Sequence, residues 1–126
     1  MSTKRDAEEE LDAALTLAGP VFAGYERQFG YIHGRKFRAD FAWPAARLLV
    51  EVQGGAWSGQ AHGSITGVLA DIERLNIAML NGWRVLRFAT GKTWERPYRT
   101  VRMDEWVAEV LSTIERALAA PAEASG

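Results

Sequence analysis

The 126-residue sequence contains no cysteine. Disulfide scaffolds, thiolate metal sites and cysteine nucleophiles are therefore excluded. The sequence also lacks an apolar run approaching the roughly 18 residues of a membrane span, and its first ten residues, MSTKRDAEEE, are too polar for a secretory signal. We therefore expect a cytoplasmic protein with no membrane partner. The length predicts one domain over residues 1–126, with its core at about 6–120 and a frayed C-terminal tail.

Several enzyme motifs are absent as well. The chain has no GxGxxG or GxxxxGKS/T phosphate loop, no HExxH and no GxSxG, which gives little support to a small-molecule enzyme of those classes. The net charge of −1 does not by itself indicate a nucleic-acid partner. However, twelve Arg and Lys against six Asp and Glu lie between residues 24 and 102, a net charge of +6 for the middle of the chain. A basic segment that also contains carboxylates is consistent with a binding site for a polyanion, in which a metal ion bridges the carboxylates and the polyanion. Surface arginines are common, however, so the pattern is only suggestive.

The segment that organises the chain is RKFRADFAWPAARLLVEVQGG, residues 35–55. It predicts a β-hairpin with arms at residues 35–43 and 47–53 and a turn at 44–46. Because side chains alternate across a strand, Asp40 should share a face with Lys36 and Arg38, and Glu51 should share a face with Gln53. The opposite faces should carry the apolar side chains, Phe37, Ala39 and Phe41 on the first arm and Leu48, Val50 and Val52 on the second.

This hairpin permits two interpretations. Acidic residues on two adjacent, otherwise apolar strands are costly unless a cation lies between them, and a divalent metal ion is the natural candidate. Alternatively, Asp40 and Glu51 are ordinary polar positions on the solvent face of an antiparallel hairpin.

The rest of the chain predicts a mixed sheet covered by helices. Residues 6–18 are helical in pattern, and Glu8 continues the buried stripe of that helix, although a surface acid that stabilises the helix dipole is the alternative. The remaining segments predict a strand at 25–33, a glycine-rich loop at 54–63 containing Trp57 and His62, a helix at 64–81, a strand at 83–88, an irregular basic stretch at 89–101 and a helix at 104–120. The long helix should connect two parallel strands as a βαβ crossover. The result is an α/β fold of order αβββαβ with a closing helix.

This order, with Asp40 on the second strand and Glu51-Val52-Gln53 on the third, resembles the PD-(D/E)XK nuclease superfamily, which has a restriction-endonuclease-like fold. The segments RADFAWPAARLLVEVQGG and DIERLNIAMLNGWRVLRF are similar to small phage and bacterial endonuclease-domain proteins. Those proteins are related to very-short-patch repair endonucleases and Holliday junction resolvases. The resemblance covers roughly residues 8–88.

The resemblance implies a metal site. Asp40 and Glu51 would be the metal-binding carboxylates, and the carbonyl of Val52 a third ligand. Glu8 matches a glutamate that helps to bind metal in junction resolvases, with Glu26 as an alternative. Hard oxygen ligands of this kind favour Mg²⁺ or Mn²⁺.

One residue departs from the family pattern. Gln53 stands where the superfamily usually has a lysine, and glutamine can form hydrogen bonds but carries no charge. Lys36 or Arg38, on the predicted face of Asp40, is a candidate for the missing positive charge.

The function implied by the resemblance is metal-dependent hydrolysis of DNA phosphodiester bonds. The first hypothesis is a structure-selective Holliday junction resolvase. The alternatives are a nicking endonuclease of the very-short-patch repair type acting on duplex DNA, and a catalytically weakened DNA-binding protein. Cleavage of two strands would need a twofold homodimer, and the setting would be the cytoplasm of a bacterial or phage-infected cell. The candidate DNA contacts are Arg27, Lys36, Arg38, Trp57, His62 and Arg74.

Overall fold

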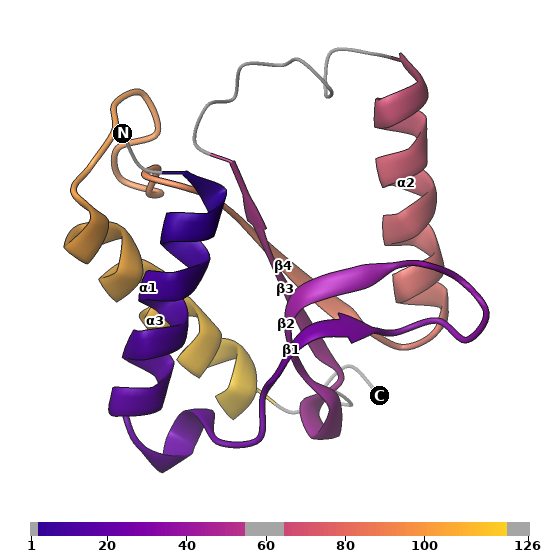
Figure 1. Ribbon diagram of the computed structural model, residues 1–126, viewed down its shortest axis with the longest axis horizontal. Helices are drawn as coiled ribbons and strands as arrows, with labels where there is room; N and C mark the ends of the chain where they lie inside the picture. The colour runs from indigo at the N-terminus through magenta and orange to yellow at the C-terminus, as the bar shows by residue number, and fades with distance from the viewer. Residues whose placement is uncertain (1–2, 55–64, 121–126) are drawn as a thin grey trace.

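The computed structural model describes residues 3–54 and 65–120. Within these ranges the chain forms three α-helices and a four-stranded mixed sheet (Figure 1). The elements in chain order are α1 (Lys4–Leu17), β1 (Glu26–Gly30), β2 (Arg38–Trp43), β3 (Leu48–Gln53), α2 (Ile65–Leu80), β4 (Arg84–Ala89) and α3 (Met103–Ala119), with short 3₁₀ turns at Pro20–Phe22 and Pro44–Ala46. No helix in the described part of the chain is long and apolar enough to cross a membrane.

The four strands lie in the order β1-β2-β3-β4. Strand β2 pairs with β1 and with β3 in the antiparallel sense, whereas β3 and β4 are parallel. The predicted hairpin and the parallel pair joined through a helix are both confirmed. The parallel register places Glu51 beside Arg87 and brings the carboxyl ends of β3 and β4 to the same edge of the sheet.

The helices cover both faces of the sheet. Figure 1 shows α1 and α3 together on one side and α2 on the other. The side under α1 and α3 contains the larger hydrophobic cluster, in which Leu11, Phe41, Val50, Trp106 and Ile114 are fully buried. A smaller cluster around Ala42, Leu49, Ala78 and Trp83 lies on the α2 side.

Helix α1 begins two residues earlier than predicted because Thr3 caps it. The Thr3 hydroxyl accepts a hydrogen bond from the backbone N–H of Asp6, and the Asp6 carboxylate accepts one from the backbone N–H of Thr3. This reciprocal arrangement is a capping box. It places Lys4 in the first turn of the helix, one turn before Glu8, so that the two side chains lie on the same helix surface.

The predicted faces of β2 are partly wrong. Ala39 and Phe37 pack in the α2-side cluster, while Phe41 packs in the cluster under α1 and α3. The alternation is interrupted at Asp40, which lies between the paired residues of the β1–β2 ladder, opposite Gln28. Gln28 has a positive φ of 50°, a left-handed backbone conformation that non-glycine residues rarely adopt.

The first two strands are shorter than predicted. Strand β1 ends at Gly30 and β2 starts at Arg38, so Lys36 lies exposed in the connection between them and not on a strand. A turn closed by the hydrogen bond from the Arg35 N–H to the Ile32 carbonyl occupies this connection. The predicted placement of Lys36 on the strand face of Asp40 is therefore wrong.

Helix α2 has its apolar surface turned outward. Ala78 is its only buried residue, whereas Ile65, Val68, Leu69, Ile72, Met79 and Leu80 are exposed. Asp71 and Arg74, by contrast, are half-buried, and Arg74 forms an ion pair with Glu51 of the sheet. An amphipathic helix normally buries its apolar stripe. The exposed apolar surface of α2 is therefore unusual for a helix that packs against its own sheet.

Candidate active site

The two predicted carboxylates lie where β2 and β3 separate. The last paired residues of this ladder are Phe41 and Val50, and Asp40 and Glu51 are the next residues along each strand. Here the Asp40 carboxylate accepts a hydrogen bond of 2.7 Å from the backbone N–H of Val52. A side chain thus takes the place of a backbone acceptor, and the strands diverge around it.

Asp40 belongs to a cluster formed with α1 and β1. The Lys4 ammonium group donates a hydrogen bond of 2.8 Å to Asp40 Oδ1 and also bonds Glu8 Oε2. Glu8, which is only 7% exposed, also accepts hydrogen bonds from the Arg27 guanidinium at 2.9 Å and from the Gln28 amide at 3.3 Å. The prediction that Glu8 continues the buried stripe of α1 is confirmed.

Glu51 is bound by cations from the other side. It is 5% exposed and forms ion pairs with Arg74 of α2 and, at 3.0 Å, with Arg87 of β4. A buried carboxylate requires such partners because an uncompensated charge in the interior is costly. Glu51 therefore connects three elements, namely β3, β4 and α2.

Both carboxylates line the same cavity. This cavity, of about 240 Å³, is lined by Lys4, Arg38, Asp40, Glu51, Val52, Gln53, Gly54, Asp71 and Arg74. It lies between the N-terminal turn of α1 and the sheet-facing side of α2. Three cationic and three acidic side chains line it, so its charge is balanced.

The charges of the cations in this cavity are reinforced by their surroundings. Partial burial opposes the charge of Lys4, but hydrogen bonds to Asp40 and Glu8 outweigh it and hold the pKa of Lys4 above its ordinary value. Burial likewise opposes the charge of Arg74, whereas a hydrogen bond with Tyr31 and the charge of Glu51 raise the pKa of Arg74. Both side chains are fully charged near neutral pH.

The cavity contains oxygen donors of the type that hard divalent cations prefer. Asp40 and Glu51 offer carboxylate oxygens to one cavity, and Mg²⁺ in proteins is commonly held by one or two carboxylates together with several waters. The described residues contain no group of three or more His, Asp or Glu side chains arranged to hold a metal ion. Lys4, which contacts both Glu8 and Asp40, provides the positive charge between these two carboxylates.

The predicted nucleic-acid contacts are distributed unevenly. Arg38 and Arg74 line the cavity. Arg27 does not line it but pairs with Glu8, whose other partner, Lys4, does. Gln53 lines the cavity as well, and its backbone carbonyl accepts hydrogen bonds from the backbone N–H and hydroxyl of Thr90. Trp57 and His62 fall outside the described residues. Glu26, the alternative to Glu8, is exposed on β1.

Sequence reasoning missed Lys4, Gln28 and Arg87. The spacing of four residues between Lys4 and Glu8 was a usable signal, because side chains at such positions meet on a helix. Arg87 could be identified only once the strand register was known, because a parallel register that pairs Leu48 with Arg84 also pairs Glu51 with Arg87. Nothing in the sequence indicated the left-handed conformation that turns Gln28 toward Glu8 and Asp40.

In the comparisons with known proteins, no family model, no curated protein and no solved structure matches this chain.

Proposed function

We propose that this chain is a metal-dependent DNA endonuclease with a restriction-endonuclease-like αβββαβ core. The observation that carries the proposal is the cavity at the divergence of β2 and β3, which is lined by both Asp40 and Glu51 and by three cationic side chains. Carboxylates able to hold a hard cation, next to groups able to bind an anion, are what phosphodiester hydrolysis requires.

In this proposal Asp40 and Glu51 hold Mg²⁺ or Mn²⁺, with the Val52 carbonyl and Glu8 as further candidate ligands. The bound ion would supply an activated water and stabilise the charge that develops on the phosphate. Gln53 positions the attacking water by a hydrogen bond, which a neutral amide can do. Lys4 supplies near Asp40 the positive charge that Gln53 lacks.

DNA is the proposed substrate because of the arginines at and beside the cavity. Arg27, Arg38 and Arg74 come from β1, β2 and α2, so cationic groups surround the two carboxylates from several elements. Contacts of this kind bind phosphates and position the backbone, but they carry no direct sequence information. We therefore propose a structure-selective enzyme of the junction-resolving kind, acting in the cytoplasm.

The test is cleavage of matched linear duplex, mismatched duplex and four-way-junction DNA in Mg²⁺ and then in Mn²⁺. We expect cleavage of the junction in preference to both duplexes. Asp40→Asn and Glu51→Gln should abolish it, and Glu8→Gln should reduce it, whereas Glu26→Gln should leave it unchanged because Glu26 is exposed on β1. Preferential nicking of mismatched duplex would instead support a repair-type endonuclease. Undiminished cleavage by Asp40→Asn would show that the site is elsewhere.

The ion pairs at the site favour one alternative, a DNA-binding protein with weakened catalysis. Glu8, Asp40 and Glu51 are each bound by one or two cationic side chains, which neutralise them without a metal ion. If calorimetric titration with Mn²⁺ detects no binding while junction DNA is bound, this alternative replaces the enzyme.

A homodimer with a twofold axis is part of the proposal, because one site per chain cannot cut two strands symmetrically. The outward surface of α2 supports it. Four residues there, Ile65, Val68, Ile72 and Met79, are exposed, and Leu75 between them is half-buried. The five follow the alternating spacing of three and four residues found in interhelical seams. Ile65 and Met79 lie seven residues on either side of Ile72, and such symmetry suits an antiparallel pair of identical helices.

Sedimentation of the wild-type protein and of Ile72→Glu tests the dimer. We expect the wild type to sediment as a dimer and the variant as a monomer, because a charge at the centre of the seam has no partner there. Leu17→Glu is the control, since Leu17 is exposed on α1, and it should remain dimeric. A monomeric wild type would contradict this part of the proposal.

A further inference from the structure

The connection between β4 and α3 exposes aromatic side chains on an anchored loop. We refer to residues 91–101 as the β4–α3 loop. Trp94 is 78% exposed and Tyr98 is 97% exposed, although aromatic side chains of this size are usually largely buried in a monomer. Exposed aromatic rings on a loop indicate contact with a partner more often than exposed aliphatic side chains do.

The loop is closed at its base. The Val101 N–H donates a hydrogen bond of 2.8 Å to the Gly91 carbonyl, so the two ends of the loop are in contact, as in an Ω-loop. In its first half, the backbone N–H of Trp94 donates to both carboxylate oxygens of Glu109 on α3, at 3.1 and 3.3 Å. These contacts fix the backbone that carries the exposed rings, which reduces the ordering cost of binding a partner.

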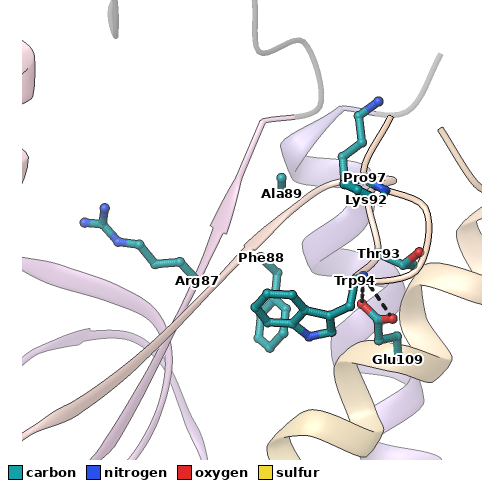
Figure 2. Close-up of a pocket in the computed structure, with 8 residues that line it drawn as sticks. All are labelled: Arg87, Phe88, Ala89, Lys92, Thr93, Trp94, Pro97 and Glu109. Atoms are coloured by element: carbon teal, nitrogen blue, oxygen red, sulfur yellow. Dashed lines mark hydrogen bonds between the residues drawn. The ribbon is translucent and has the colours of Figure 1, made fainter. Parts of the chain in front are cut away.

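Trp94 borders a pocket of about 200 Å³ that is also lined by Phe88, Pro97, Lys92 and Glu109 (Figure 2). The view shows Arg87 extending away from this pocket, and its guanidinium binds Glu51 in the candidate active site. The pocket thus combines apolar walls with one carboxylate, Glu109, and one ammonium group, Lys92. Apolar walls beside a carboxylate acceptor suit an uncharged ring with amino groups.

Cationic side chains lie along the same loop. Lys92, Arg96 and Arg99 belong to it, and within the described residues no ion pair of Lys92 or Arg99 with an acid is found. Cations next to stacking rings are the combination by which proteins bind single-stranded nucleic acid. A protein partner would also suit exposed aromatic residues, but it would not account for cations left without acidic partners.

The loop starts beside the candidate active site. Thr90, the residue before it, donates two hydrogen bonds to the carbonyl of Gln53, at 2.7 and 3.1 Å, and Gln53 lines the cavity with Asp40 and Glu51. The loop therefore begins one residue after a direct contact with the lining of that cavity.

We propose that the β4–α3 loop is a second nucleic-acid contact, in which Trp94 and Tyr98 stack on unpaired bases while Lys92 and Arg99 bind the flanking phosphates. The ligand class is single-stranded DNA or the unstacked bases of a branched or mismatched duplex. This inference rests on the proposed function for the identity of the partner as DNA, and it adds a specificity that the cationic cavity cannot supply. A fully stacked duplex offers no exposed base face to these rings.

Fluorescence anisotropy with labelled oligonucleotides in EDTA tests the inference without cleavage. The probes are a single strand, a matched duplex and a four-way junction, and the variants are Trp94→Ala, Trp94→Phe and Arg99→Gln. We expect Trp94→Ala to weaken binding of the single strand and the junction by about 5- to 150-fold, the effect of losing one stacked base. Matched duplex should bind within about twofold of the wild type. Trp94→Phe should retain most of the affinity, and Arg99→Gln should lower the salt dependence by about one unit.

Three outcomes would overturn the inference. These are unchanged binding by Trp94→Ala, equal weakening on single strand and matched duplex, and dissociation of a wild-type dimer by Trp94→Ala, which would make the loop a protein interface. Because Trp94 is exposed, its replacement should not unfold the protein, and thermal unfolding of each variant checks this. Failure here is distinct from failure of the proposed function. If Glu51→Gln abolishes junction cleavage but Trp94→Ala changes neither cleavage nor binding, the endonuclease proposal stands and the loop contact is rejected. If Trp94→Ala weakens binding of single strands but the wild type cleaves no substrate, the loop contact stands and the endonuclease proposal is rejected.

Discussion

Replacing Lys4 with methionine should destabilise the metal-free protein and, at the same time, strengthen its binding of Mn²⁺. The Lys4 ammonium contacts Asp40 Oδ1 at 2.8 Å and also bonds Glu8. The side chain of Glu8 is only 9% exposed and that of Asp40 only 13%, while that of Lys4 is 42% exposed. Methionine preserves much of the length and apolar stem of lysine and removes the charge, so the variant isolates the electrostatic role.

The loss of stability follows from the two contacts. Hydrogen bonds to charged groups contribute about 1.5–3 kcal/mol each when buried, and the partial exposure of Lys4 reduces this considerably. We expect the free energy of unfolding to fall by about 1–3 kcal/mol, which for a chain of this size lowers the Tm by roughly 4–12 °C. Arg5→Met is the matched control. Arg5 also pairs with the acid four residues ahead, Glu9, but it is 88% exposed, so its loss should cost about 0.5 kcal/mol or less.

The effect on metal binding has the opposite sign. A divalent ion bound by Asp40 would be repelled by the Lys4 ammonium. At a separation of about 5 Å the repulsion is about 1.7 kcal/mol even with the dielectric constant of bulk water, about 80, which sets the lower limit. Removing that charge should therefore lower the dissociation constant for Mn²⁺ by at least roughly 15-fold. Arg5→Met should leave it unchanged.

Calorimetric titration with Mn²⁺ and thermal unfolding with and without the ion measure both effects on the same samples. The Tm of Lys4→Met should be lower than that of the wild type in EDTA, and saturating Mn²⁺ should recover most of the difference. A variant as stable as Arg5→Met would refute the bridging role of Lys4. Unchanged or weaker Mn²⁺ binding would refute a metal position beside Asp40.

Three further predictions concern charge and backbone. Glu51→Gln removes the carboxylate that pairs with Arg74 and Arg87, and among the described residues it leaves Arg74 with Asp71 as its one acidic partner, at 3.6 Å. It should lower the free energy of unfolding by about 2–4 kcal/mol in urea titrations. The exposed acid Glu73, changed to Gln, should cost about 0.5 kcal/mol or less, and similar values for both would contradict the burial argument. The raised pKa of Lys4 means that its stabilisation is complete below its ordinary value and is lost as the pH rises through its higher folded value. The Tm difference between wild type and Lys4→Met should therefore be constant from about pH 7 to about pH 9 and should shrink only in more alkaline buffer. A difference that disappears near neutral pH would contradict the stabilising role of the charged Lys4 side chain. Gly91→Ala and Gly24→Ala both place alanine at a positive φ, but only at Gly91 would the new Cβ meet a threonine methyl, at 2.9 Å. Both should destabilise by about 1 kcal/mol through strain, Gly91→Ala should cost about 1–3 kcal/mol more through crowding, and equal losses in thermal unfolding would argue against the tight packing of the β4–α3 loop.

Much of the fold follows from local sequence patterns. The hairpin arms that end at Trp43 and Gln53, the helix at Ile65–Leu80 and the strand at Arg84–Ala89 were predicted to within a few residues. In each of these segments the spacing of the apolar residues and the position of the turn residues indicate the same type of element and similar bounds. The parallel pairing of β3 and β4 followed because the helix between them leaves no simpler connection.

The errors arose where long-range contacts override the local pattern. Asp40 was assigned a face by simple alternation, but its carboxylate accepts the Val52 N–H and so occupies the gap between two strands. The burial of Glu8 was predictable from helical spacing, whereas its bonds to Arg27 and Gln28 depend on how β1 twists under α1. The outward orientation of α2 was unpredictable for the same reason, because an apolar stripe does not say which neighbour will cover it.

Glu51 has a mechanical consequence beyond its own charge. Ala78 is the only fully buried residue of α2, so the ion pair between Arg74 and Glu51 is one of the main contacts between the middle turns of this helix and the sheet. Any ligand that competes for the Glu51 carboxylate must weaken that ion pair. Occupancy of the cavity and the position of α2 are then thermodynamically linked, and by reciprocity a molecule seated on the outer surface of α2 would alter the affinity at the cavity.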